Sequence, residues 1–294
     1  MRSLRLILNG KSAGDPAVRA AVEQLRAEGY SIDVRVTWEA GQGVRFAEEA
    51  AAQGIDVVVA GGGDGTINEI VHGLMASESA SRPALALLPL GTANDFARSW
   101  NVPLGDVAAA LATAAQSPLD EIDVGLVNDC PFVNVASGGF GAEVTARTSP
   151  EMKNLLGGAA YSITGLLTAA QLTPYPCRLV AEGQTFDLSL AMLAIGNGRM
   201  AGGGYEVAPQ ARFDDGLLDL VLVPAVPLAD LPTLVGELFN VSGEANQHVL
   251  YRQLAEFEIH FESEFQLNLD GEPLHGRDFH VSIMPRRLSI VRPA

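Results

Sequence analysis

The spacing of apolar residues predicts that strands and helices alternate through the first part of the chain. Apolar runs or strict alternation, typical of buried strands, occupy four segments, Leu4–Leu8, Ile32–Val36, Ile55–Ala60 and Ala84–Leu90. Apolar residues three and four positions apart, typical of helices, fill the segments 16–29, 45–53, 67–75 and 104–115. This order predicts an α/β domain with a doubly wound parallel sheet.

The pattern changes near residue 122 to many short strands that are separated by turn residues. These strands are expected at 124–127, 131–136, 177–181, 185–193, 217–223, 257–261, 265–269 and 279–283. Many short strands predict a β-sandwich, so we divide the chain into domains at residues 1–122 and 123–294. A helix is expected near 159–172, and a last strand at 289–291 belongs to either domain.

The most informative stretch runs from Ile55 to Val71, with the sequence IDVVVAGGGDGTINEIV. A buried strand is followed by three glycines and then by the apolar stripe of a helix. Glycines let backbone N–H groups approach a phosphate, and a helix start adds unpaired donors and the positive end of its dipole. Asp64 would repel a bare phosphate, so its presence indicates that Mg²⁺ lies between them, directly or through water.

Two better-known glycine motifs do not fit this stretch or its surroundings. The dinucleotide fingerprint G-x-G-x-x-G fails because Thr66 stands at its sixth position, counted from Gly61. The P-loop fails because Arg5 stands where its first glycine belongs, upstream of Gly10-Lys11-Ser12. A glycine turn that only allows tight packing is the alternative, and the added Asp64 argues against it.

Polar residues and glycines follow several of the predicted parallel strands. In such sheets, ligands bind beyond the carboxyl ends of the strands. These ends carry Asn9 with Gly10 and Lys11, Thr37, Gly62–Thr66, and Gly91 with Thr92. The sequence therefore predicts a single nucleotide-binding edge, although a threonine in such a place is otherwise an ordinary turn or cap residue.

Two acidic turns lie in the second half of the chain. The segment NLDGEP, residues 268–273, places Asp270 and Glu272 around a glycine, where one carboxylate can accept the proton of an attacking hydroxyl. Asp-Gly is also the common signal of a surface hairpin. The segment DDG, residues 214–216, offers a carboxylate and exposed carbonyls, which suit Mg²⁺ or Ca²⁺ or else form a solvated turn.

The motif GGGDGTINE, with LGTANDF downstream, resembles the catalytic domain of the diacylglycerol kinase superfamily. The resemblance covers nearly the whole chain and is nearest to the bacterial YegS-like lipid kinases. It also rests on NGKSAG, NVASGGFGAEVT, IGNGRMAGGG, DDGLLDL and NLDGEPL. It implies an α/β domain like that of NAD kinase and diacylglycerol kinase, followed by a β-sandwich that binds lipid.

The resemblance implies a site for ATP in the first domain. It assigns to the ATP phosphates the loop of Gly63, Asp64, Gly65, Thr66, Ile67, Asn68 and Glu69. It adds nucleotide contacts from Thr37 and Thr92. Together with Gly62 and Asn9 at the same predicted edge, these residues form the candidate ATP site.

The resemblance also gives roles to the acidic turns of the second domain. It makes Glu272 the proton acceptor, with Asp270 as the alternative base or as a partner linked to the metal. It implies a structural Mg²⁺ held by the carboxylate of Asp215 and the carbonyls of Arg212 and Leu217. Such an ion would order the second domain and would not activate ATP.

The chain has 294 residues, 48% of them hydrophobic, and a formal net charge of −16. The negative charge argues against a nucleic-acid partner and against tight electrostatic binding to anionic lipid. No apolar run reaches the roughly 18 residues of a transmembrane helix, and the start lacks the apolar core of a signal peptide. We therefore expect a cytoplasmic protein that visits the inner face of the membrane transiently. The oligomeric state, a homodimer included, stays open.

These observations combine into one hypothesis with three alternatives. The hypothesis is an ATP- and Mg²⁺-dependent kinase that phosphorylates a hydroxyl of a lipid such as diacylglycerol or phosphatidylglycerol. One alternative is a kinase of a soluble alcohol such as NAD, and another is a nucleotide-binding regulator without turnover. The last is a dinucleotide oxidoreductase, against which the missing glycine at position 66 counts.

Overall fold

A computed structural model of the chain describes residues 1–77, 82–139 and 174–293. The chain forms two compact units, one of residues 1–123 with residues 286 onward, the other of residues 124–285. Strand β15, Glu272–Val291, runs through the second boundary, so the end of the chain belongs to the first unit. The helix expected at 159–172 lies outside the described residues.

The first unit is built on a parallel sheet. Its strands are β1 (Ser3–Asn9), β2 (Ser31–Thr37), β3 (Val57–Gly62) and β4 (Ala84–Pro89), in the spatial order β2-β1-β3-β4. The end of β15 extends the sheet beyond β4, where Ile290 pairs in parallel with Leu85. Its helices are α1 (Pro16–Ala27), α2 (Gln42–Ala52), α3 (Asp64–Ala76), α4 (Asp95–Ser99) and α5 (Val107–Gln116).

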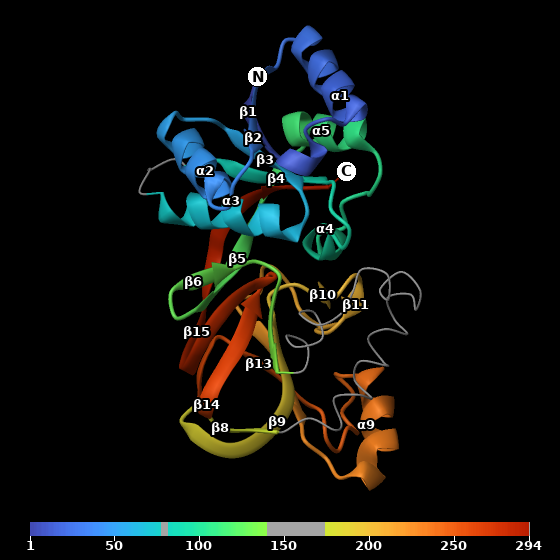
Figure 1. The fold of residues 1–294 in the computed structure, drawn as a ribbon, viewed down its shortest axis with the longest axis vertical. Coiled ribbons are helices and arrows are strands. Elements are labelled where there is room, and N and C mark those ends of the chain that lie inside the picture. The colour runs from blue at the N-terminus through green and yellow to red at the C-terminus, as the bar shows by residue number, and fades with distance from the viewer. Residues whose placement is uncertain (78–81, 140–173, 294) are drawn as a thin grey trace. The chain divides into compact units, whose positions relative to one another are not determined.

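Helices cover both faces of this sheet, which confirms the predicted doubly wound arrangement. Leu4, Leu6 and Leu8 of β1 share one buried cluster with Leu25 of α1, and residues of α5 complete it. The intervening side chain of Arg5 reaches α2 on the opposite face, where α2 and α3 lie side by side (Figure 1). Successive side chains of a strand point to opposite faces of the sheet. The three leucines of β1 therefore lie on the face covered by α1 and α5, and Arg5 lies on the face covered by α2.

Helix α1 begins and ends on the signals that predict it. The side chain of Asp15 caps the helix by accepting a hydrogen bond from the amide of Ala17, 2.8 Å away, and Pro16 occupies the first turn. Gly29 then takes a φ of +96°, in the left-handed region that commonly ends helices. Local sequence chemistry therefore suffices to place this helix.

Arg5 is buried in the middle of β1, a role that its apolar neighbours do not predict. Its Nε donates to Asp33 Oδ2 at 2.9 Å on β2, and its Nη2 donates to Gln53 Oε1 at 2.7 Å. A third bond, from Nη1 to the carbonyl of Phe46, measures 3.3 Å. With its donors satisfied in this way, the guanidinium ties β2 and α2 to the central strand.

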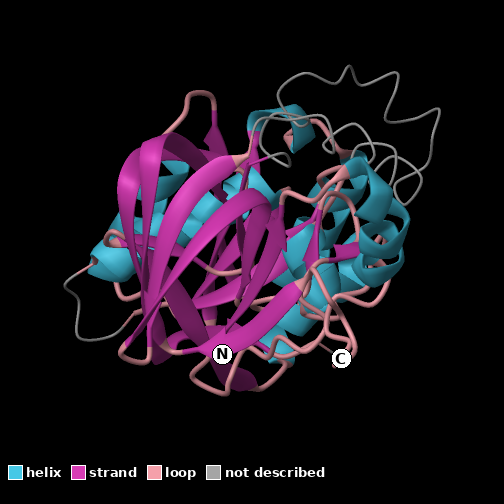
Figure 2. Ribbon diagram, turned by 90° about the horizontal axis from the view of Figure 1, so that it is seen from below, coloured by secondary structure: helices cyan, strands magenta, loops and turns pink. Residues whose placement is uncertain are grey.

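The second unit consists mostly of strands, shown in magenta in Figure 2, which confirms the β-rich second domain. Strand β5 (Leu119–Val127) leads into it from the first unit. The further elements are β6 (Cys130–Phe132), β7 (Val135–Gly139), β8 (Tyr175–Ala181), β9 (Gln184–Gly196), β10 (Met200–Ala201), β11 (Tyr205–Glu206), β12 (Leu218–Pro224), α9 (Leu231–Leu238), β13 (Leu250–Leu254) and β14 (Glu256–Leu269).

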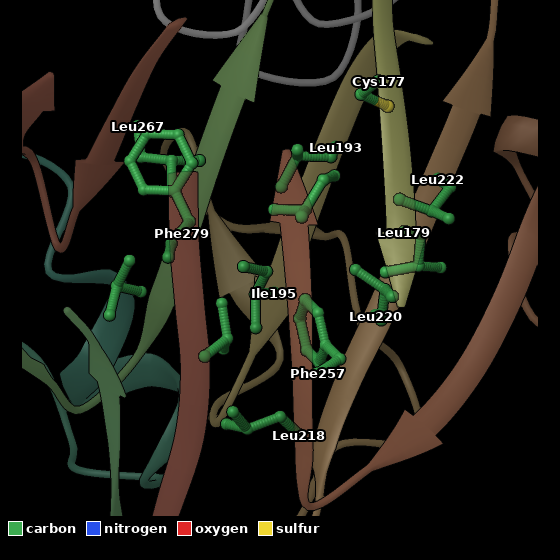
Figure 3. Packing of buried hydrophobic residues seen from close by; sticks show 14 of the residues in the cluster. Cys177, Leu179, Leu193, Ile195, Leu218, Leu220, Leu222, Phe257, Leu267 and Phe279 are labelled. Carbon is green, nitrogen blue, oxygen red and sulfur yellow. The ribbon is translucent and has the colours of Figure 1, made fainter. Parts of the chain in front are cut away.

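Strand pairing encloses the core of the second unit. Strands β7 and β8 each pair with both β9 and β14, so the ladder closes into a ring around apolar side chains. Ile195, Leu220, Phe257 and Phe279 are among those buried there (Figure 3). Successive side chains of each strand point alternately into the ring and away from it, and those that point inward are the apolar residues of this core.

The structure differs from the prediction in the limits of several strands. The segment expected at 131–136 is divided between two strands, β6 and β7. The segments expected at 257–261 and 265–269 are one strand, β14, whose register with β15 shifts between His260 and Phe265. Polar residues of this shifted part interrupt the apolar alternation, so the sequence pattern divides a continuous strand. The segments expected at 279–283 and 289–291 likewise belong to the single strand β15.

Helix α9 carries a buried carboxylate that holds the segment after it. Glu237 is 8% exposed, and it accepts hydrogen bonds from the amides of Gln247 (2.7 Å), His248 (3.0 Å) and Val249 (2.9 Å). Burial acts to raise the pKa of Glu237, but these three bonds outweigh it and bring the pKa below its ordinary value of 4.5. The ionised carboxylate is thus an anchor for residues 247–249.

We expect Glu237→Gln to lower the free energy of unfolding by roughly 1–3 kcal/mol, because an amide NH₂ group cannot accept these bonds. Urea unfolding at pH 7 measures the loss, with Glu244→Gln at an exposed site as the control. The lowered pKa of Glu237 stabilises the fold above pH 4.5, and that contribution is lost as pH falls through the folded-state pKa. The gap between the two proteins should therefore shrink in acid, and a constant gap would contradict this assignment.

Candidate functional site

The glycine turn joins β3 to α3 as the sequence predicts. All residues of β3 are buried, and Gly63 occupies the cap position of α3 with Asp64 in the first turn. The amides of Thr66 and Ile67 bond to the carbonyl of Gly63, at 3.0 and 3.2 Å, and so begin the helix. Within the described residues, no side chain caps this N-terminus. The first amides of α3 therefore keep their capacity to bind an anion.

A second glycine turn, after β4, lies directly against the first. A Cβ built on Gly91 would stand 2.4 Å from the Cα of Gly63, so only glycine allows this approach. The amide of Leu90 donates to the carbonyl of Gly62 at 2.9 Å. Asn94, at a φ of 53°, closes the second turn by accepting from the Gly91 amide at 2.9 Å and donating to its carbonyl at 2.8 Å.

Asp64 connects the two turns. Its Oδ1 accepts a hydrogen bond from the amide of Phe96 at 3.1 Å, in the first turn of α4 (Asp95–Ser99). Asp64 is half-buried, and its second oxygen, Oδ2, has lone pairs of its own. The carboxylate thus has a structural contact in the protein and retains acceptor capacity toward a cation or water.

The carboxyl ends of the parallel strands meet at one edge, as the sequence predicts. Asn9 lies opposite Thr37, and Gly62 lies opposite Pro89. The Asn9 side chain accepts from the amide of Lys11 at 3.0 Å and so caps the short helix η1, Gly10–Ser12. The hydroxyl of Thr37 donates to the carbonyl of Leu8 at 3.4 Å.

Other predicted nucleotide residues differ in how far solvent reaches them. Thr92 and Gly65 are exposed, whereas Thr66, Ile67 and Asn68 are buried in the first turns of α3. Ile67 belongs to the apolar stripe of the helix, which is the pattern that predicted the helix. The turn and Thr92 are therefore the parts of this set that a ligand can reach from solvent.

Glu69 has an evident structural contact at the start of α2. Its Oε1 accepts from the amide of Gly41 at 3.1 Å, and its Oε2 accepts from the amide of Gly43 at 2.8 Å. These are amides at the N-terminus of α2, which begins without a side-chain cap of its own. Glu69 thus couples α3 to the segment between β2 and α2.

In the second unit, the turn between β14 and β15 carries Asp270 and Glu272. Asp270 stands at a φ of 50°, and its carboxylate accepts from the amides of Val133 (2.7 Å), Asn134 (2.9 Å) and Val135 (3.0 Å). Glu272 is exposed at the first position of β15. The two carboxylates, which lie on either side of Gly271 in the sequence, therefore have different surroundings. Nothing in the spacing of the motif predicts the amides that surround Asp270.

The acidic turn 214–216 lies on the surface of the second unit. Asp215 Oδ1 accepts from the amide of Leu217 at 3.1 Å, while Asp214 pairs with the guanidinium of Arg212 at 3.3 Å. Gly216 takes a φ of 72°, which completes a tight turn. Of the two carboxylates in this turn, Asp214 is paired with Arg212 and Asp215 is not part of that pair.

Asp219 lies three positions after this turn and is fully buried. Burial raises the pKa of the Asp219 carboxyl to about 6, and the nearby negative charge of Asp215 adds to the rise. Hydrogen bonds from Tyr251 and Gln253 act in the opposite direction. The carboxylate of Asp215 and the backbone carbonyls of the turn are oxygen donors, the ligand type that Mg²⁺ and Ca²⁺ prefer.

Across the part of the chain that the structure describes, no three His, Cys, Asp or Glu side chains come together in a group that could hold a metal ion by themselves. A divalent ion at either acidic position must therefore take most of its ligands from backbone carbonyls, water or phosphate oxygens, as Mg²⁺ commonly does. Among the same residues, no helix combines the length and apolar character of a membrane span.

Comparison with known proteins places the chain among kinases. Residues 3–127 match the diacylglycerol kinase catalytic domain, and residues 134–292 match the YegS C-terminal NAD kinase beta sandwich-like domain. A protein of Chromohalobacter salexigens named "Probable lipid kinase YegS-like" is 47% identical over 289 residues, covering 98% of this chain and 92% of the relative. The chain belongs to the YegS-like lipid kinase family. Membership makes it a phosphotransferase and confirms the resemblance drawn from the motifs.

Other members and a solved structure agree with this assignment. A protein of Yersinia enterocolitica with the same name is 44% identical over 289 residues, covering 98% of this chain and 96% of the relative. A crystal structure from Bacillus anthracis strain Sterne, assigned as a diacylglycerol kinase, is similar with a TM-score of 0.82 at 25% identity. That match covers 99% of this chain and 95% of the other. The similarity therefore extends over both units.

Proposed function

We propose that this member of the family is an ATP-dependent kinase that phosphorylates a hydroxyl of a lipid. The observation that carries the proposal is the turn between β3 and α3, where an uncapped helix start, Asp64 and the turn after β4 meet. A glycine turn at a helix N-terminus is suited to a triphosphate. The first unit then binds the nucleotide, and the second supplies the proton acceptor and the lipid site.

Residues of the first unit divide the work on the nucleotide. The amides of Gly63–Gly65, at the cap and in the first turn of α3, donate to phosphate oxygens, and the dipole of the helix favours the negative charge of the phosphates. Asn9, Thr37 and Thr92, at strand ends of the same edge, contact the rest of the nucleotide. Ile67 and Asn68 are buried in the first turns of α3, so they hold the helix in place and do not contact the nucleotide.

Asp64 is the residue of the first unit that would hold Mg²⁺ with the triphosphate, directly or through water. One of its oxygens fixes the start of α4, and the other is suited to this task. When bound, the ion would neutralise the negative charge that develops on the transferred phosphoryl group. The donor set fits Mg²⁺, which usually takes one or two carboxylates together with phosphate and water oxygens.

Glu272 is the proton acceptor in this proposal. The attacking hydroxyl loses its proton to Glu272 as its oxygen bonds to the γ-phosphorus, and the bond to the β-phosphate oxygen breaks to release ADP. Glu272 is exposed and therefore accessible to an acceptor alcohol. Asp270 is the weaker candidate because three amides already occupy its carboxylate. We assign Asp270 the task of fixing the turn that carries Glu272.

The names of the relatives support a lipid as the acceptor, and the name of one solved structure includes diacylglycerol. We propose phosphatidylglycerol as a second candidate acceptor. The enzyme would then work transiently at the inner face of the membrane. A soluble acceptor such as NAD is the competing proposal, because the second unit matches a domain described as NAD kinase beta sandwich-like. A nucleotide-binding regulator without turnover is a further alternative, against which the intact carboxylates at 64 and 272 count.

Transfer of radiolabel tests the proposal directly. Purified protein is incubated with γ-labelled ATP, Mg²⁺ and either mixed vesicles containing diacylglycerol and phosphatidylglycerol or NAD. We expect label in the lipid fraction and none in NAD. Label in NAD alone would favour the soluble acceptor, and nucleotide binding without any transfer would favour the regulator.

We further propose that Asp215, with the carbonyls of Arg212 and Leu217, holds Mg²⁺ or Ca²⁺ as a structural ion of the second unit. Its only task there would be to order the turn beside buried Asp219. Such an ion stabilises the folded chain in proportion to its saturation.

We expect Mg²⁺ or Ca²⁺ to raise the melting temperature of the parent protein. Near saturation, the ion should add about 1–3 kcal/mol to the free energy of unfolding. Asp215→Ala should melt lower, and its melting temperature should not respond to either ion. Asp214→Ala, a carboxylate already paired with Arg212, is the matched control and should keep the response. An equal response in Asp215→Ala and the parent would place the ion elsewhere.

A further inference from the structure

Trp38 is the residue that immediately follows β2 at the edge described above, and its side chain is 87% exposed. Tryptophan is rarely left in solvent to this extent, since it offers a large apolar face and a single polar N–H. The other tryptophan, Trp100, is half-buried and donates from Nε1 to the carbonyl of Val291 at 3.0 Å. The exposed face of Trp38 is therefore available to a ligand.

The backbone of Trp38 is fixed although its ring is exposed. Its amide donates to Gln42 Oε1 at 2.7 Å, which holds the residue against the start of α2. That helix start is itself bonded to Glu69 of α3, through the amides of Gly41 and Gly43. The ring is thus displayed from a segment that is connected to the glycine turn of β3 and α3.

The distance along the edge from the β3 turn to Trp38 is comparable to the distance from the triphosphate to the base of a nucleotide. Strand β2 is separated from β3 by β1 alone, so two strand spacings, about 10 Å, lie between their ends. Gly10, at the end of β1, lies close to the end of β2, since a Cβ on it would stand 2.6 Å from the carbonyl oxygen of Thr37. A triphosphate at the β3 turn that extends over β1 brings its base to β2.

We propose that Trp38 is the platform for the nucleobase, with its indole stacked on the purine of the bound nucleotide. The inference rests on the proposed ATP site and adds to it the residue that selects a nucleotide over a bare polyphosphate. Stacking of a base on an aromatic side chain accounts for roughly a tenfold change in affinity, and it tolerates different bases. We therefore expect Trp38 to favour purine nucleotides without separating ATP from GTP strongly.

Calorimetry of the otherwise native chain separates this proposal from the ATP site itself. Trp38→Ala should weaken the binding of Mg²⁺-ATP about tenfold and leave the binding of Mg²⁺-tripolyphosphate unchanged, while Trp38→Phe keeps most of the ATP affinity. Equal ATP affinity in Trp38→Ala and the parent would overturn the platform and leave the ATP site standing. Absence of ATP binding in the parent would overturn both.

Fluorescence of Trp100→Phe, in which Trp38 is the remaining tryptophan, gives an independent measurement. We expect Mg²⁺-ATP to quench its emission, and Mg²⁺-tripolyphosphate and phosphatidylglycerol vesicles to leave it unchanged. A blue shift with vesicles, without a response to ATP, would show that Trp38 inserts into the membrane interface and would overturn the proposal.

Discussion

Replacement of Glu272 by glutamine is expected to lower kcat by about 10²–10⁴-fold, which is the usual contribution of a general base. Glutamine keeps the size of the side chain but cannot accept the hydroxyl proton. Because Glu272 is exposed, the melting temperature should not change, and calorimetry should show unchanged ATP binding. Glu262→Gln, another exposed glutamate on the same hairpin, should retain full activity.

The variant Asp270→Asn distinguishes the two carboxylates of this turn. An asparagine has a single acceptor oxygen, so it cannot satisfy the three amides that Asp270 binds, and stability should fall together with activity. Full activity in Glu272→Gln, with lost activity and an unchanged melting temperature in Asp270→Asn, would reverse the roles proposed for them.

Replacement of Asp64 by asparagine is expected to lower kcat/KM at least about 100-fold, the scale of losing one electrostatic group from a reaction centre. The asparagine oxygen can still accept from the amide of Phe96, so the contact between the two turns survives while the charge is lost. The melting temperature should therefore stay close to that of the parent. Steady-state kinetics over a range of Mg²⁺ concentrations measure the effect.

Asp64→Ala provides the comparison, because it removes both the charge and the contact with Phe96. It should lose as much activity as Asp64→Asn and should also melt at a lower temperature. Normal turnover in Asp64→Asn together with failure in Asp64→Ala would show that Asp64 serves only the contact between the turns.

The sequence predicts the parts of the fold in which local chemistry and tertiary structure agree. Helix α1 has its cap at Asp15, its apolar stripe and its stop at Gly29, and each signal coincides with the observed element. The apolar run of β3 likewise predicts a strand that is buried on both faces. Strand β14 was divided wrongly because a register shift, set by its partner β15, interrupts the alternation.

The sequence predicts the parts of the candidate site that depend on local motifs, but not the contacts that depend on the tertiary fold. The glycine turn, Asp64 and the strand ends follow from the order of strands in a parallel sheet. The contacts of Asp64 with Phe96 and of Glu69 with Gly41 join residues that only the fold brings together. The amides around Asp270 come from residues 133–135, and no local pattern reveals that pairing. Sequence thus identifies reactive groups, whereas structure separates those in contact with solvent from those already bonded.

A crystal structure with Mg²⁺ and a non-hydrolysable ATP analogue tests the central claim most directly. We predict that oxygens of the β- and γ-phosphates lie within about 3 Å of the amide nitrogens of Gly63–Gly65, with the cation beside Asp64. A nucleotide bound elsewhere, with these amides still in contact with solvent, would contradict the account.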